Sequence, residues 1–310
     1  MRTHSNSRLH RSGLGLLIGL CLPALAQGSF SLIFTGGPRL SCDPAPSYVA
    51  GSHCFSQAEQ NKLFARQITA LRNARPDLNL KGMWINGNLT ASGSQQQWEW
   101  LQNFWLKDHA PDSAFPHWFG LGENEMRLPA AKAVMQTQIS QTGGQQAPAG
   151  QVFSFDFAGR HFVQLQSFKS IGGVDQRRNI DWLREDRLRA VNSDKPIVAL
   201  LDDSTLTHSI RPALTAVGSV WGRLTRATIF TTLPTNVLAR ERAPGEGRSW
   251  GFMPPKWQIG AIEQGTALLV TFHDNKNSMR VMTLRTQEGK ALPILTDLGE
   301  FWLYGVDDDH

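Results

Sequence analysis

Residues 153–167 read FSFDFAGRHFVQLQS, and this stretch decides the fold class. Apolar and polar side chains alternate before and after Ala158 and Gly159, which is typical of two antiparallel strands joined by a tight turn. A helical pattern around Trp182 follows, and the apolar run PIVALL at 196–201 then predicts a buried strand. Strands that alternate with helices in this way indicate an α/β protein.

The same alternation extends toward both ends of the chain. Before the hairpin we expect strands in SLIFT (31–35), MWIN (83–86) and FPHWFGLG (115–122); after it, in TIFTTL (228–233), QIGAIE (258–263), TALLVTFHD (266–274) and MRVMTLRT (279–286). Three further helices are expected: one opened by a capping box of Ser56 and Glu59 and ended by Pro76, one that buries Trp98, Leu101 and Trp105, and one around 129–141. We expect one domain over residues 27–310, with a long Gly/Pro-rich loop at 240–257 and an acidic tail at 304–310.

The N-terminal segment has a composition of its own. Three arginines precede an apolar run that closes on the small-residue pattern Ala24-Leu25-Ala26. This order is typical of a secretory signal peptide, so we expect residues 1–26 to be removed and the protein to be periplasmic or secreted. No later run in the sequence is apolar enough to span a membrane.

The net charge argues against one class of partner. The whole chain carries +5, but residues 1–26 hold three arginines and no acidic residue, so the exported protein would carry about +2. The remaining lysines and arginines form no cluster along the sequence. Nucleic acid is therefore not an expected partner.

Two cysteines lie beyond the signal segment, Cys42 and Cys54. In an exported protein such a pair more often forms a disulfide than a metal site, so we expect a Cys42–Cys54 disulfide. Closing a loop of this length stabilises a fold by about 3 kcal/mol in the chain-entropy model. His53, adjacent to Cys54, leaves zinc binding as the weaker alternative.

Three of the predicted strands run directly into turns that contain glycine: TGGP at 35–38, NGNLTASG at 86–93 and LGENE at 121–125. In α/β sheets, ligands bind at the carboxyl ends of strands. Together with FSFDFAGRHFVQLQS and the later IDWLREDRLRAVNSDKPIVALLDD, this order resembles the calcineurin-like metallophosphoesterase family over most of residues 30–285. The resemblance implies a four-layer α-β-β-α sandwich with two mixed sheets. It also implies that the strand-end loops occupy the place where the family holds two metal ions.

Laid on the family pattern, the turns match and the metal ligands do not. Gly37 and Arg39 stand at two first-loop ligand positions, and Asn88 replaces the Asp that would bridge both metals. In the third loop Glu123 takes the family's Asn position, Asn124 takes that of the catalytic His, and Glu125 fits the acidic position. Asp202 stands where a later His is expected, and Thr232, Leu233 and Thr235 stand in the closing histidine block.

Loss of these ligands has a chemical consequence. An Asn carbonyl brings no charge, and without the bridging carboxylate, the first-loop Asp and the histidines a pair of transition metals lacks adequate coordination. We therefore expect a pseudophosphatase with no cofactor, retained for binding an unidentified protein or small ligand or for assembly.

An enzyme with altered chemistry is the main alternative. Glu123, Glu125, Asp202, Asp203 and His208 could converge at the strand ends, and their carboxylate oxygens suit one Mg²⁺ or Ca²⁺. The chain would then be a phosphoesterase with a carboxylate-rich metal site. Asp202 and His208 with a nearby Ser or Thr also have the composition of a nucleophilic triad, but the sequence has no Gly-x-Ser-x-Gly turn.

A binding module without small-molecule chemistry is the third class. The chain has ten tryptophans, and Trp250 and Trp257 in the Gly/Pro-rich loop are the candidates for contact with a partner protein. We expect His161 to be an ordinary structural residue of the hairpin and His117 to lie on the surface. Asn88-Leu89-Thr90 has the form of a glycosylation acceptor, although it lies in a predicted pocket loop.

Overall fold

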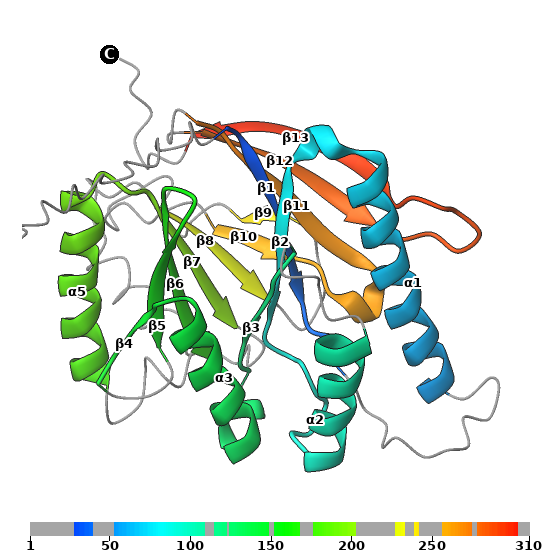
Figure 1. Ribbon diagram of the computed structural model, residues 1–310, viewed down its shortest axis with the longest axis horizontal. Coiled ribbons are helices and arrows are strands. Elements are labelled where there is room, and N and C mark those ends of the chain that lie inside the picture. The colour runs from blue at the N-terminus through cyan, green and yellow to red at the C-terminus, as the bar shows by residue number, and fades with distance from the viewer. Residues whose placement is uncertain are drawn as a thin grey trace, which may run out of the picture.

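Two mixed β-sheets lie face to face in the computed structural model of the protein, with helices on their outer sides (Figure 1). The structure describes residues 28–39, 53–108, 115–122, 124–148, 152–167, 176–202, 227–232, 239–241, 256–274 and 278–302.

The first sheet has six strands in the order β13-β12-β11-β1-β2-β3. Its strands are β1 (Phe30–Gly36), β2 (Leu80–Asn86), β3 (His117–Gly120), β11 (Thr266–Phe272), β12 (Ser278–Arg285) and β13 (Ile294–Trp302). β1, β2 and β3 are parallel, whereas β11, β12 and β13 pair antiparallel. Parallel pairing brings the carboxyl ends of β1, β2 and β3, with their glycine turns, to one edge of the sheet.

The second sheet has seven strands in the order β4-β5-β6-β7-β8-β10-β9. They are β4 (Gln145–Gln146), β5 (Phe153–Phe157), β6 (Arg160–Ser167), β7 (Ile197–Asp202), β8 (Ala227–Thr232), β9 (Ala239–Glu241) and β10 (Lys256–Ile259). The predicted hairpin is confirmed, because β5 and β6 pair antiparallel around Ala158 and Gly159. Both turn residues have positive φ, 46° and 74°, as a type I′ turn requires.

Helices cover the outer side of each sheet. They are α1 (His53–Ala74), α2 (Gln95–Leu101) with the π-helical η2 (Gln102–Asp108), α3 (Pro129–Gln141) and α5 (Gln176–Asn192), with short 3₁₀ turns η1 (Pro76–Leu78), η3 (Glu125–Arg127) and η4 (Ile262–Gln264). Trp182 and Leu183 of α5 pack on the second sheet against Val163 and Ala199. In Figure 1, α5 lies beside the second sheet and α1 beside the first.

Aromatic side chains fill the space between the two sheets. Phe34 of the first sheet stacks on Phe230 of the second, with ring centroids 4.2 Å apart. Trp84 stacks on Phe155 and Phe162 from the opposite sheet, with ring centroids 5.5 and 5.4 Å apart. The predicted α/β fold with two mixed sheets in four α-β-β-α layers is confirmed.

Several expected elements differ in detail. α1 begins at His53, three residues before Ser56, so the capping box is wrong; Ser is tolerated inside a helix and does not by itself mark the start. Glu59 instead pairs with Lys62 at 2.8 Å. The strand expected at QIGAIE ends at Ile259.

Two further differences concern the last third of the chain. Trp257 lies in β10 and is fully buried, so its assignment to an exposed partner-contact loop is wrong. Because the residues before it are rich in Gly and Pro, the sequence did not predict that the short strand β10 begins at Lys256. β13 was not expected, because its exposed side chains lie on both faces and the sequence shows no simple alternation.

Candidate functional site

The first two strand-end turns touch each other through their backbones. The amide of Gly37 donates to the Gly87 carbonyl at 2.9 Å, and the amide of Arg39 donates to the Asn88 carbonyl at 2.9 Å. A β-carbon on Gly37 would stand 2.2 Å from the Asn88 oxygen and 2.4 Å from the Gly87 oxygen. The position where the resembling family carries an Asp therefore has no room for a side chain.

Asp202 ends β7 and enters the same place from the second sheet. Its side chain is 1% exposed. Gly87 has φ +65, and a β-carbon there would stand 2.2 Å from the Asp202 carboxyl carbon. Glycine at this turn thus allows both the left-handed backbone and the close approach of a carboxylate.

Glu125, on η3, joins the second and third turns. It is fully buried. Oε1 accepts hydrogen bonds from the Thr90 amide, at 2.8 Å, and from the Thr90 hydroxyl, while Oε2 accepts from the Gly122 amide at 3.0 Å. Burial raises the pKa of Glu125, and the bonds from Thr90 and Gly122 offset this only in part.

Two carboxylates come close together beside Gly122. Asp202 Oδ2 and Glu125 Oε2 each lie 2.8 Å from the point where a β-carbon on Gly122 would stand. The two oxygens are therefore separated by no more than twice that distance. Like charges this near in a buried setting favour protonation of one carboxyl group or the presence of a cation.

A chain of side-chain hydrogen bonds connects the sheets at this edge. Trp84 Nε1 donates to Gln164 Oε1 at 2.8 Å, Gln164 Nε2 donates to Asn86 Oδ1 at 2.9 Å, and Asn86 Nδ2 donates to Thr232 Oγ1 at 3.1 Å. The Thr232 hydroxyl donates back to the Asn86 carbonyl at 2.5 Å. All four residues are buried, so water does not compete for these hydrogen bonds.

The structure brings together part of the predicted set. Gly37, Asn88, Glu125, Asp202 and Thr232 all lie at this edge. Arg39 is exposed with φ 45, and the side-chain amide of Asn124 donates from Nδ2 to the Ala91 carbonyl at 3.0 Å. Glu123, Asp203, His208, Leu233, Thr235, Trp250 and Cys42 lie outside the described residues, as does the side chain of Cys54.

Three residues of the site escaped the sequence analysis: Asn86, Thr90 and Gln164. Asn86 carried a usable signal, since it is a polar residue at the end of a buried strand, directly before glycine. Thr90 and Gln164 had none, because their partners lie 35 and 78 residues away. In the formal glycosylation sequence Asn88-Leu89-Thr90, Thr90 is 1% exposed, whereas the acceptor residue Asn88 is half-buried.

A groove lies apart from the strand ends, between α3, β3 and β5. Its volume is about 830 Å³, and His117, Trp118, Val134 and Phe157 are among the residues that line it. His117, expected on the surface, is half-buried there. At the β3 edge, Gln138 of α3 accepts from the Phe119 amide at 2.8 Å and donates to the Phe119 carbonyl at 3.0 Å.

Within the described part of the chain, no group of three or more His, Cys, Asp or Glu side chains is arranged to hold a metal ion. No described helix is long and apolar enough to cross a membrane.

No family model and no curated protein matches the sequence. Among solved structures, Vacuolar Protein Sorting 29 from Cryptosporidium parvum is similar with a TM-score of 0.34 and 8% identity over 88% of this chain and 99% of that one. Vps29 from Chaetomium thermophilum has a TM-score of 0.35 and 9% identity over 89% of this chain and 98% of that one. Similarity at this level assigns neither a family nor a function.

Proposed function

We propose that this chain is an exported protein that keeps a metallophosphoesterase-like fold for binding or assembly and does not hydrolyse phosphate esters. The contact between Gly37 and Asn88 is the observation that carries the proposal. The resembling family places a carboxylate at each position. Here the first has no room for a side chain, and the second presents an uncharged amide.

The chemistry of a two-metal phosphoesterase explains why these changes matter. Carboxylates neutralise two dications, and the metals generate the hydroxide that attacks phosphorus. Thr232 and Asn86, at the same edge, are hydrogen-bonded to each other rather than presented toward a ligand. The residues at the strand ends support packing better than they support metal catalysis.

The direct test is metal analysis combined with an activity assay. We expect the purified protein to retain less than stoichiometric Mn, Fe and Zn, and to leave an aryl phosphate uncleaved when these metals are added. Stoichiometric metal together with turnover that Asp202→Asn abolishes would overturn the proposal. Asp181→Asn is the matched control, because Asp181 is an exposed residue of α5 that pairs with Arg184.

A second candidate is a single-cation site at Glu125 and Asp202, favoured by the approach of both carboxylates to Gly122. Oxygen ligands of this kind suit Mg²⁺ or Ca²⁺. A rise in melting temperature with either ion that Asp202→Asn removes and Asp181→Asn preserves would support it. The same melting temperature with and without each divalent ion would dismiss it.

The proposed export and binding role have separate tests. Removal of residues 1–26 predicts a mature N-terminus at Gln27, which N-terminal sequencing of the fractionated protein checks. For partners, we expect capture of a specific protein from a periplasmic or culture extract to be lost when the segment between β9 and β10, residues 242–255, is shortened and the buried Trp257 is left in place. Capture that is unchanged by this deletion would place the contact surface elsewhere.

A further inference from the structure

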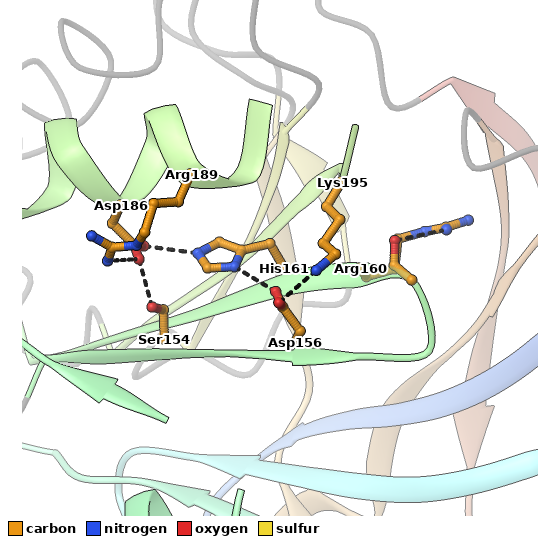
Figure 2. A network of polar contacts seen from close by, with 8 residues as sticks. Ser154, Asp156, Arg160, His161, Asp186, Arg189 and Lys195 are labelled. Atoms are coloured by element: carbon orange, nitrogen blue, oxygen red, sulfur yellow. Dashed lines mark hydrogen bonds and ion pairs between the residues drawn. The ribbon is translucent and has the colours of Figure 1, made fainter. Parts of the chain in front are cut away.

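Charged side chains alternate in sign along a chain of contacts on the outer side of the second sheet (Figure 2). Lys195 Nζ lies 2.6 Å from Asp156 Oδ2, His161 Nδ1 lies 2.8 Å from Asp156 Oδ1, His161 Nε2 lies 2.8 Å from Asp186 Oδ2, and an Arg189 nitrogen lies 2.6 Å from Asp186 Oδ1. Asp156 belongs to β5, His161 to β6, and Asp186 and Arg189 to α5. The central imidazole therefore connects the hairpin to the helix.

The centre of this chain is buried and its ends are open to solvent. The side chains of His161 and Asp186 are 7% and 2% exposed, whereas that of Asp156 is 50% exposed. The Ser154 hydroxyl donates to Asp186 Oδ1 at 2.7 Å. Each carboxylate oxygen of both aspartates thus has at least one partner, and the interaction between His161 and Asp186 is shielded from water.

The geometry determines the protonation state of the ring. A neutral imidazole has one N–H and one nitrogen lone pair, so it donates only one hydrogen bond. Both ring nitrogens of His161 face carboxylate oxygens at 2.8 Å, and an ionised carboxylate only accepts. The imidazolium form satisfies both contacts, whereas the neutral form would set a lone pair against one of the carboxylates.

The surrounding carboxylates also favour the protonated form of His161. Burial alone would lower the pKa of His161, but the hydrogen bonds and charges of Asp186 and Asp156 outweigh it and raise the pKa above its ordinary value of 6.5. Among the described residues, the charged groups of this network are Asp156 from β5, Asp186 and Arg189 from α5, and Lys195 from the segment after α5.

We propose that the protonated His161 ring fastens α5 to the β5–β6 hairpin, and that loss of its proton as pH rises loosens this attachment. A cavity of about 390 Å³ borders the network and is lined by His161, Asp156, Arg189 and Lys195 among others. Solvent can therefore exchange the proton on Nδ1, the ring nitrogen that faces the half-exposed Asp156, without unfolding of the sheet. Trp182 and Leu183 still hold α5 by apolar contacts, so the expected change is local loosening of the helix.

The experiment follows the ring and the helix together. The His161 ring should titrate by NMR above 6.5, and hydrogen exchange in α5, corrected for intrinsic rates, should accelerate as pH rises through that midpoint. Because the pKa of His161 is raised in the folded protein, its protonation contributes to the free energy of unfolding. That contribution is fully present below pH 6.5 and is lost as pH rises through the folded pKa. His161→Gln should remove this pH-dependent loss of stability.

Two further variants keep the proposal falsifiable. Asp156→Asn, on the solvent side, should fold normally and lower the His161 titration midpoint, because it removes one of the two carboxylates. His273→Gln is the control, since His273 is more exposed and pairs with Glu300 at 2.9 Å, away from α5; it should leave α5 exchange unchanged. A His161 ring that is neutral at pH 6, or α5 exchange that does not follow its titration, would overturn the proposal.

Discussion

The carbonyl oxygen of Asn88 lies 2.2 Å from the point where a β-carbon on Gly37 would stand. The three atoms nearest to that point belong to the backbone of residues 87 and 88, so no side-chain rotation relieves this overlap. The two turns must move apart to accept any residue other than glycine. This contact makes position 37 a packing requirement of the present fold.

Substitution of Gly37 tests that contact. Gly37→Ala should lower the free energy of unfolding by about 1–3 kcal/mol, the range for overpacking a closed site. Gly28→Ala is the control, because a β-carbon there meets nothing within 4 Å, and its change should stay within about 0.5 kcal/mol. Denaturant titration measures both, and equal stability of the two variants would contradict the close approach of the turns.

Glu125 should affect stability through the amide groups that it binds. Glu125→Ala leaves the Thr90 and Gly122 amides without their acceptor, which should cost about 1–3 kcal/mol. Glu99→Ala, on the exposed side of α2, is the control and should be nearly neutral. Thermal unfolding of the three proteins provides the comparison.

The pH dependence of Glu125 has a definite sign. Because its pKa is raised in the folded protein, the native state binds a proton more tightly than the unfolded state does. The contribution of Glu125 to the free energy of unfolding is therefore greatest at pH values below 4.5, its ordinary pKa, and declines as pH rises through the folded pKa. Glu125→Gln cannot titrate, so its stability relative to wild type should increase with pH over this window; a constant difference would contradict the raised pKa.

Gln138 protects the free edge of β3. Its side-chain amide satisfies both the Phe119 amide and the Phe119 carbonyl, as a neighbouring strand would. Gln138→Ala should destabilise the protein by about 1–3 kcal/mol and increase self-association, because it exposes unpaired strand groups. Gln141→Ala, on an exposed residue of α3, is the control. Sedimentation velocity over a concentration series measures the association.

Ala158, the first of the two turn residues of the β5–β6 hairpin, adopts a backbone conformation that is unfavourable for alanine. Its φ of 46° is disfavoured for a residue with a β-carbon, whereas Asn tolerates this region and Asn-Gly is preferred in type I′ turns. Ala158→Asn should therefore stabilise the protein by about 0.5–1 kcal/mol. A decrease in the unfolding midpoint would show that the turn has a different geometry.

Local patterns predicted most of the elements. The helix from Pro129 to Gln141 and the antiparallel hairpin match the structure, because each is encoded by adjacent residues: a proline start and a periodic apolar face, or period-two alternation around a turn. Trp98, Leu101 and Trp105 are buried as expected. The start of α1 and the strand β13 were missed, since neither has a sharp boundary signal in the sequence.

The site was harder to predict, for a physical reason. The sequence placed Gly37, Asn88 and Asp202 at strand ends, but it did not indicate that Asn86 would bond Thr232 across 146 residues. Nor did it indicate that Glu125 would be held by Thr90. Such contacts depend on how the two sheets are stacked, which the local sequence does not specify. The burial of Trp257 was missed for a related reason, because the residues around it have the composition of a loop although Trp257 lies in the core.

The hydrogen-bond chain from Trp84 through Gln164 and Asn86 to Thr232 has a consequence for protein engineering. Thr232→His, made to bind metal, would leave the Asn86 side-chain amide without its acceptor and the Asn86 backbone carbonyl without its hydroxyl donor. Gln164, which donates to Asn86 Oδ1, would be affected in turn. Positions 86, 164 and 232 therefore have to be redesigned as one unit. A route to a metalloenzyme that begins with Thr232→His alone therefore passes through a variant less stable than the starting protein.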